Sequence, residues 1–155
     1  MNTVTVTLTK QPELYFEADL ITPDQFAGKS VEEIGALEIS EGKIKYPLSA
    51  YATIEGAAGA TAAESRIVLN GDWTRVKRIG QQMTAGEIVI NSNTDMYTGG
   101  WIKGGKVTVN GNVDSFTGIA MAGGELTVNG NAQNHVGSAY RGDWRGMTGG
   151  VLRVK

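Results

Sequence analysis

The sequence predicts an all-β protein, a parallel β-helix that winds as a solenoid with coils of about 19 residues, preceded by a small N-terminal α/β cap. Two observations predict this class. The segments 87–91, 106–110 and 125–129 share one alternating pattern and begin 19 residues apart. Glycine accounts for 22 of 155 residues, about twice its usual share, which suits a chain that turns tightly many times. A fixed period of this length indicates stacked units and outweighs local propensity.

The first 48 residues differ from the rest and are expected to form the cap. Residues 3–9 alternate apolar and polar side chains, as a strand does. Thr22 and Ser30 each stand at a predicted helix start, Thr22 before a proline and Ser30 three residues before a glutamate. We therefore divide the chain into a cap, 1–48, and parallel β-helix coils, 49–155, which we expect to be open at the C-terminal end.

Each coil is expected to contribute one residue to each of four sequence columns. One column is asparagine, whose side-chain amides are expected to bond from coil to coil as a ladder. Two glycine columns mark corners where the backbone takes positive φ or passes close to its neighbour. A fourth column holds methionine or isoleucine. The columns are Asn70, Asn91, Asn110 and Asn129; Gly80, Gly99, Gly118 and Gly137; Gly86, Gly105, Gly124 and Gly150; and Met83, Ile102, Met121 and Met147.

Other β architectures fit the sequence less well. A leucine-rich repeat would show a leucine pattern that is absent here, and a β-sandwich would not keep one asparagine in register. The hexapeptide β-helix of acyltransferases is closer, because apolar residues at 90, 96 and 102 are six apart. That spacing ends before Val109, and Asn134 replaces an apolar residue in a later coil.

Composition excludes several kinds of chemistry within this chain. The sequence has no cysteine and one histidine, so it can form no disulfide, thiolate nucleophile, cysteine-bound cluster or multi-histidine metal site. The net charge of −2 argues against binding nucleic acid or an anionic membrane through bulk charge. No apolar run reaches the length of a membrane-spanning helix, and we expect a cytoplasmic location.

The candidates for chemistry are weak, and we predict no catalytic, cofactor-binding or metal-binding residue. His135 shares a column with Arg78, Tyr97 and Phe116, which favours a stacked planar side chain over a catalytic base. Residues 100–107 nearly match a phosphate-binding loop but have valine where the magnesium-binding Ser or Thr belongs. Three corner aspartates lack the spacing of calcium-binding repeats, so we expect them to be solvated. They are Asp72, Asp95 and Asp114.

One coil carries an insertion. Glycine and methionine of the columns are three residues apart in two coils, but ten residues separate Gly137 from Met147. The seven extra residues must bulge outward, because the coil beneath keeps its size. They include the types that dominate interface hot spots, with an aspartate placed to hold an arginine. We predict a docking loop with the partner-binding residues Tyr140, Arg141, Asp143, Trp144 and Arg145; the alternative is an inert loop whose tryptophan covers the coil edge.

The same residues resemble a known family. The segment 80–88, the repeated Gly…Met-x-Gly-Gly pattern and the run 137–150, with its Tyr-Arg-Gly-Asp-Trp-Arg, are similar to the C subunit of formylmethanofuran dehydrogenase. Residues 26–30, followed by an acidic helix, are similar too. The glycine repeats also resemble the C subunit of the bacterial formyltransferase/hydrolase complex and the C-terminal β-helix of glutamate synthase large subunits. Members of the first family usually continue with further coils after Gly150, whereas this sequence ends at Lys155.

The resemblance implies a non-catalytic structural subunit of formylmethanofuran dehydrogenase, an archaeal oxidoreductase complex that reduces carbon dioxide and fixes it as formyl-methanofuran in methanogenesis. It implies no cofactor in this chain, and partner subunits that carry a tungsten- or molybdenum-pterin, iron–sulfur clusters and a dinuclear metal site. The implied partners are those subunits, especially the amidohydrolase-like one, with no nucleic acid and no membrane. The alternatives are the C subunit of a formyltransferase/hydrolase complex, a glutamate-synthase-like spacer, and a β-helix enzyme acting alone on a carbohydrate or acyl donor.

Overall fold

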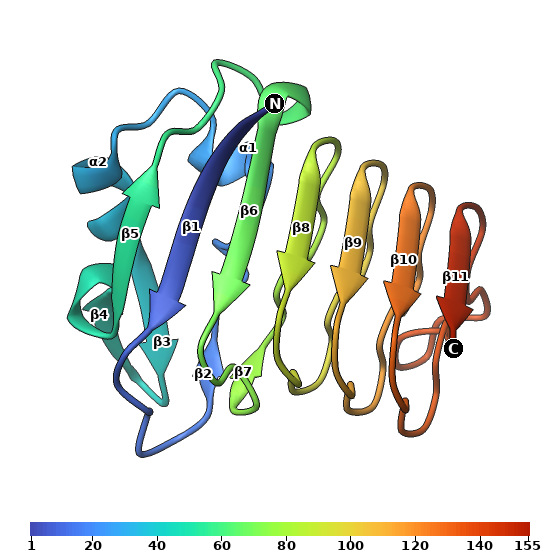
Figure 1. Ribbon diagram of the computed structural model, residues 1–155. Helices are drawn as coiled ribbons and strands as arrows, with labels where there is room; N and C mark the ends of the chain where they lie inside the picture. The colour runs from blue at the N-terminus through green and yellow to red at the C-terminus, as the bar shows by residue number, and fades with distance from the viewer.

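Most strands of the protein lie in one seven-stranded sheet, as the computed structural model of residues 1–155 shows (Figure 1). The strands are β1 (Asn2–Leu8), β5 (Ala52–Gly56), β6 (Ser65–Asn70), β8 (Glu87–Ile90), β9 (Lys106–Val109), β10 (Glu125–Val128) and β11 (Val151–Val154). Their order across the sheet is β11-β10-β9-β8-β6-β1-β5. The pair β1–β5 is antiparallel, and every other neighbouring pair is parallel.

A second, four-stranded sheet packs near the N-terminal end of the first. It contains β2 (Phe16–Glu17), β3 (Glu38–Glu41), β4 (Ile44–Pro47) and β7 (Val76–Lys77), in the order β4-β3-β2-β7. Only the pair β2–β7 is parallel. Three of its strands lie within the predicted α/β cap, 1–48, but β7 belongs to the predicted coils, and its pairing of Val76 with Phe16, about 60 positions away, was not predicted.

Four short helices complete the structure: α1 (Pro23–Phe26), α2 (Val31–Gly35) and the 3-10 helices η1 (Leu48–Ala50) and η2 (Ala62–Glu64). The two predicted helix starts are confirmed. The Thr22 and Ser30 hydroxyl oxygens accept hydrogen bonds from the third backbone N–H groups of α1 and α2, at 3.1 and 3.2 Å. None of the helices has the length and apolar character needed to cross a bilayer.

The predicted fold class, a simple parallel β-helix, is wrong. Both sheets mix parallel and antiparallel pairs. Between successive strands of the large sheet the chain returns mainly through turns, with two isolated bridges, Thr94–Val113 and Val113–Ala132. The physical reason is that a sequence period gives the spacing of equivalent residues, but not how many segments of each period are extended. The division of the chain at residue 48 stays a prediction.

The strands predicted from the 19-residue spacing do stack in register. β8, β9 and β10 pair in parallel, so that Ile88 lies opposite Val107, and Val107 lies opposite Leu126. These three side chains are fully buried, and they belong to a core cluster of 28 residues. Alternation along each strand therefore places one row of side chains in the core, as expected.

The predicted asparagine ladder is confirmed at the end of these strands. Asn91, Asn110 and Asn129 each donate a hydrogen bond from Nδ2 to Oδ1 of the preceding asparagine, at 2.9 Å, with Asn70 as the first acceptor. Equivalent residues of adjacent strands lie close enough for this contact because parallel strands are about 4.8 Å apart. The ladder links the C-terminal ends of four neighbouring strands, β6, β8, β9 and β10.

Close backbone approach explains one of the glycine columns. Gly105 has φ of +83°, and a Cβ atom there would lie 2.7 Å from the carbonyl oxygen of Gly86. No side chain fits such a position without displacing the neighbouring backbone. In the apolar column, Met83, Ile102 and Met121 are buried, whereas Met147 is exposed where the column reaches the insertion.

Candidate functional site

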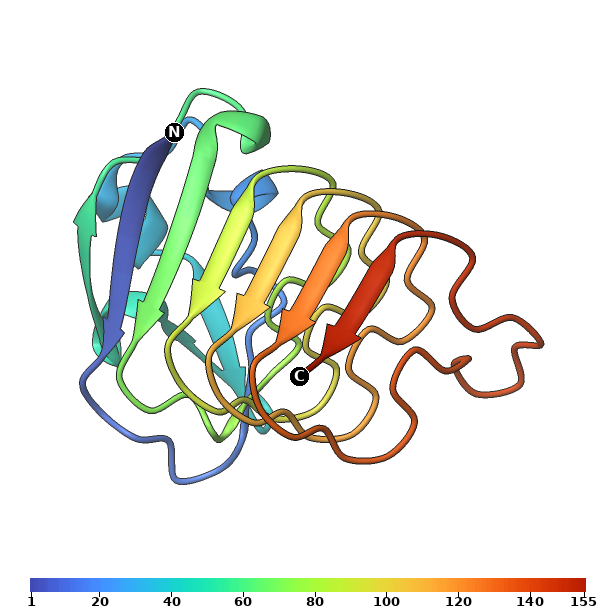
Figure 2. The same ribbon diagram turned by 45° about the vertical axis from the view of Figure 1, so that its right-hand side comes forward.

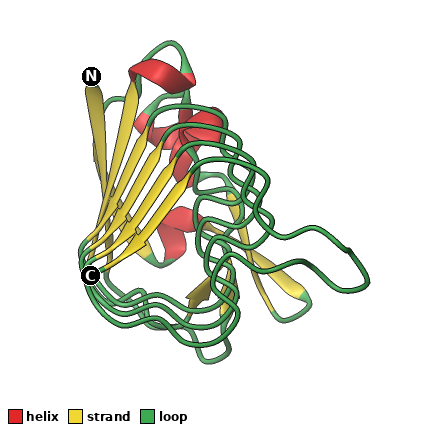
Figure 3. Cartoon of the chain, turned by 90° about the vertical axis from the view of Figure 1, so that its right-hand side faces the viewer, coloured by secondary structure: helices red, strands yellow, loops and turns green.

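The predicted docking loop, residues 138–147, projects between β10 and β11 on the side away from the strands of the large sheet (Figures 2 and 3). Both ends of the loop are held. The Tyr140 ring packs edge-on against the Trp101 ring, with 5.2 Å between centroids. At the other end the Met147 N–H donates to the carbonyl oxygen of Gly137, at 3.2 Å. The loop therefore leaves and rejoins the stack at fixed points, while its middle extends into solvent.

A tight turn forms the tip of the loop. The Asp143 N–H donates to the Tyr140 carbonyl oxygen at 2.9 Å, and Gly142, with φ of +71°, supplies the left-handed residue in between. Trp144 follows the turn and is 80% exposed. The Arg145 guanidinium lies over its indole, 4.1 Å from the ring centroid. This cation–π contact orders the pair without covering it.

The charged side chains of the loop make no ion pair. The ion pairs of the protein join Arg66 with Glu87, Arg78 with Glu17 and Arg153 with Glu125. The expectation that Asp143 holds an arginine is therefore wrong, since the Asp143 carboxylate forms no ion pair. All five predicted partner-binding residues are exposed, and their role in binding a partner stays a prediction.

The predicted planar column is confirmed beside the loop. The Arg78 guanidinium lies 4.6 Å from the centroid of the Tyr97 ring. Tyr97 stacks on Phe116, and Phe116 on His135, each at 5.2 Å with the rings within 10° of parallel. The Trp101 ring stacks on Tyr97 at 6.2 Å, so that the column connects through Trp101 to the start of the loop.

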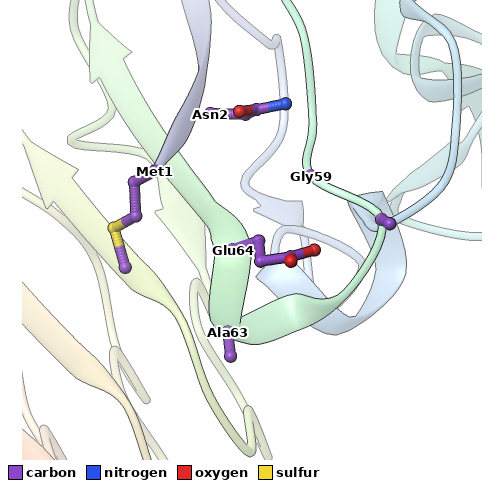
Figure 4. A pocket seen from close by; sticks show the side chains of 6 residues that line it. Met1, Asn2, Gly59, Ala63 and Glu64 are labelled. Carbon is purple, nitrogen blue, oxygen red and sulfur yellow. The ribbon is translucent and has the colours of Figure 1, made fainter.

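The largest hollow of the protein has a volume of about 540 Å³ and lies beside the starts of β1 and β6 (Figure 4). Its one ionisable side chain, Glu64, already accepts hydrogen bonds from the N–H and the hydroxyl of Thr61, both at 3.1 Å. A smaller polar hollow of about 170 Å³ lies between corner residues and includes Asp114. Nowhere in residues 1–155 do three His, Cys, Asp or Glu side chains gather in a group able to hold a metal ion.

A third hollow, about 200 Å³, adjoins a buried polar pair. The Glu41 carboxylate accepts one hydrogen bond from the Leu14 N–H and one from the Tyr51 hydroxyl, both at 2.8 Å. The Leu14 N–H and then the Tyr51 hydroxyl lower the pKa of Glu41. Burial, and then the bond to Glu41, raises the pKa of Tyr51 to about 12. One oxygen of the carboxylate thus holds the segment before β2 against β3, and the other holds Tyr51, which precedes β5.

Asp95 corrects the expectation of solvated corner aspartates, since it is only 4% exposed. Its Oδ1 accepts a hydrogen bond from the Met96 N–H at 2.7 Å, while its buried Oδ2 has no partner. Loss of solvent raises the pKa of Asp95, against the opposing effects of the Met96 N–H and Lys77. The sequence carries no signal for this burial, because Asp72 and Asp114 occupy similar corners and are less enclosed.

The contact between Trp101 and Tyr140 was also missed at the sequence level. Trp101 follows Gln82 by 19 residues and precedes Ala120 by 19, and the next step reaches Ala139, beside Tyr140. This 19-residue spacing, continued from Ala120, predicts that the start of the loop lies in the same column as Trp101.

No family model matches the chain. A curated relative, the C subunit of the tungsten-containing formylmethanofuran dehydrogenase 2 of Methanococcus maripaludis, is 49% identical over 148 residues, which cover 96% of this chain and 53% of the relative. Over these residues the chain is similar to the C subunit of formylmethanofuran dehydrogenase. The resemblance predicted from the sequence is thereby confirmed, and the chain spans about half the length of that relative.

Two further comparisons agree with this relationship. The C subunit of the molybdenum-containing formylmethanofuran dehydrogenase 1 of Methanosarcina barkeri is 48% identical over 88 residues, covering 57% of this chain and 29% of the relative. Among solved structures, a chain of the formyltransferase/hydrolase complex from Methylorubrum extorquens, crystallised with methylofuran, superposes with a TM-score of 0.85. It is 25% identical and covers 97% of this chain, which corresponds to 55% of that chain.

Proposed function

We propose that this chain is a non-catalytic structural subunit of formylmethanofuran dehydrogenase, the complex that reduces carbon dioxide and fixes it as formyl-methanofuran. The observation that carries the proposal is the 49% identity to the Methanococcus maripaludis relative over nearly the whole chain. The enzyme activity then belongs to the assembled complex, and this chain contributes as one of its subunits. A cytoplasmic location is part of the same proposal.

The residues of the chain support a role without bound cofactors. With no cysteine and one histidine, it lacks the ligands for an iron–sulfur cluster or a multi-histidine centre. Under the proposal, a tungsten- or molybdenum-pterin, iron–sulfur clusters and a dinuclear metal site are held by the partner subunits. The amidohydrolase-like subunit is the proposed neighbour, and the loop 138–147 is the proposed contact. Its support is the exposed Trp144 and Arg145 pair, of the types that dominate binding energy at interfaces.

The alternative function is a subunit of a formyltransferase/hydrolase complex. The observation that favours it is the structural superposition on a chain of that complex over 97% of this chain. The identity is 25% there against 49% for the dehydrogenase relative, which makes the dehydrogenase the first choice.

Affinity purification from the native organism separates these two functions. With a tag on this chain, we expect pterin- and iron–sulfur-containing subunits to co-purify, together with tungsten or molybdenum detected by elemental analysis. Co-purification of a formyltransferase without those metals would favour the alternative. Carbon dioxide reduction by the isolated chain would contradict the non-catalytic role.

A further inference from the structure

The residues of the planar column have a strained backbone conformation. Seven non-glycine residues have φ between 49° and 67°, and they recur at equivalent positions. They are Arg78, Gln82, Tyr97, Trp101, Phe116, Ala120 and His135. In this region glycine or asparagine is the easier choice, and bulky side chains are rare. Here four of the seven positions carry aromatic rings, so the chain tolerates strain in order to place planar side chains at one corner.

These rings form one continuous surface with the loop. We call Tyr97, Trp101, Phe116, His135 and Tyr140 the aromatic ridge. The ring contacts run from His135 through Phe116 and Tyr97 to Trp101 and then Tyr140, as stacked and edge-on pairs whose centroids are 5.2–6.2 Å apart. None of the five is buried, and His135 and Tyr140 are exposed. The ridge therefore leads from the corner to the loop without a break in aromatic contact.

The loop carries an excess of positive charge. Arg141 and Arg145 extend from it, whereas Arg78 lies over Tyr97 and pairs with Glu17. Asp143 is the single acidic residue of the loop, and neither loop arginine has an ionic partner in the chain. An acidic surface is the complement of such a group, since unpaired guanidinium groups bind carboxylates in a bidentate manner.

We infer that the aromatic ridge and the loop form one contact surface for a neighbouring protein of the complex, which offers an apolar pocket for Trp144 bordered by carboxylates. This rests on the proposed function for the identity of the neighbour. Trp144 and Arg145 are the anchors, because an exposed tryptophan loses the most water-accessible area on binding and its arginine is already oriented on the ring. The ridge supplies the flat apolar area beside them.

The test is the stability of the tagged complex towards loss of this chain. Trp144→Ala, and separately the double change Arg141→Glu with Arg145→Glu, should each weaken retention about tenfold or more in 0.15 M salt. The matched controls lie on the β4 hairpin, where residues 43–45 are exposed: Ile44→Ala for the apolar change and Lys43→Glu with Lys45→Glu for the charge reversal. The controls should be retained like the unaltered chain.

A ridge variant separates binding from folding. Phe116→Asn removes two stacking contacts but places a residue that tolerates positive φ, so the chain should remain folded at the assay temperature, as its melting curve will show, while retention falls. If the loop and ridge variants are retained as well as the controls, the inference is overturned and the structural role within the complex stands. If they alter self-association of the isolated chain instead, the occupant is a second copy, and the inferred partner is wrong.

Failure of the proposed function gives a different result. The unaltered chain would then co-purify with proteins unrelated to the dehydrogenase, and loss of those proteins from the Trp144→Ala variant would still support the contact surface.

Discussion

Two carboxylates show how differently this protein treats buried acids. Glu41 has a hydrogen-bond donor at each oxygen, and the Leu14 N–H and Tyr51 hydroxyl keep its pKa low. Asp95 has a donor at one oxygen only, and burial raises its pKa. The difference lies in the supply of donors, because a buried charge is tolerated only when it is hydrogen-bonded or paired.

Tyr51→Phe tests the Glu41 pair. Removing the hydroxyl leaves Oε2 of Glu41 without its donor, so the free energy of unfolding in urea near neutral pH should fall by about 1–3 kcal/mol. Because the folded-state pKa of Glu41 lies below 4.5, its stabilisation is present above that pH and is lost as the pH falls through the lowered pKa. The cost of Tyr51→Phe should therefore shrink in acid.

Tyr46→Phe is the control for this prediction, because Tyr46 packs against Tyr51 while its hydroxyl makes no hydrogen bond. Equal costs for Tyr46→Phe and Tyr51→Phe would contradict the role of the Glu41 bond.

Asp95→Asn tests the buried carboxylate that has a hydrogen-bond donor at one oxygen only. The folded-state pKa of Asp95 is above its ordinary value of 3.8, so the wild-type protein loses stability as the pH rises from below 3.8 through the raised pKa. The unfolding free energy of the variant should improve relative to wild type over that interval, since asparagine carries no charge to bury. Lys77 and Asp114 act on the same carboxylate and set the size of the effect.

Urea unfolding of both proteins from pH 3 upwards measures this change. Asp114→Asn is the matched control at the equivalent, less buried corner. A difference between Asp95→Asn and wild type that stays constant with pH would contradict the buried-charge account.

Among the elements, the asparagine ladder joins β6 to three strands that are only four residues long, β8, β9 and β10. Asn110 donates to Asn91 and accepts from Asn129, whereas Asn129 takes part in one ladder bond only. With about 0.5–1.5 kcal/mol for each bond, Asn110→Ala should cost about twice as much unfolding free energy as Asn129→Ala. Thermal unfolding of the two variants measures this difference. Equal losses of unfolding free energy would contradict a stabilising role for the ladder bonds.

At the scale of the whole molecule, the local part of the architecture follows from the sequence and the long-range part does not. The 19-residue spacing predicts the parallel register of Ile88 with Val107, because each period repeats one local conformation. By contrast, Val4 pairs with Gly56 on one side and Ile67 on the other, across more than 50 residues and in opposite directions. No local sequence pattern specifies those pairing partners. These long-range pairings are part of the reason that the fold has two mixed sheets and is not the predicted β-helix.

The same limit applies to the candidate site. The insertion between Gly137 and Met147 can be counted in the sequence, so the loop and its five side chains were predictable as a bulge. The contact of Tyr140 with Trp101 and the free carboxylate of Asp143 depend on where the loop folds back, which spacing does not determine.

We propose that this chain works as a scaffold within a larger enzyme. Native mass spectrometry of the complex, purified through a tag on this chain, tests that role. We expect an assembly whose mass includes this chain together with the metal-carrying subunits of formylmethanofuran dehydrogenase. A mass corresponding to the free chain alone, from cells in which that enzyme is abundant, would contradict it.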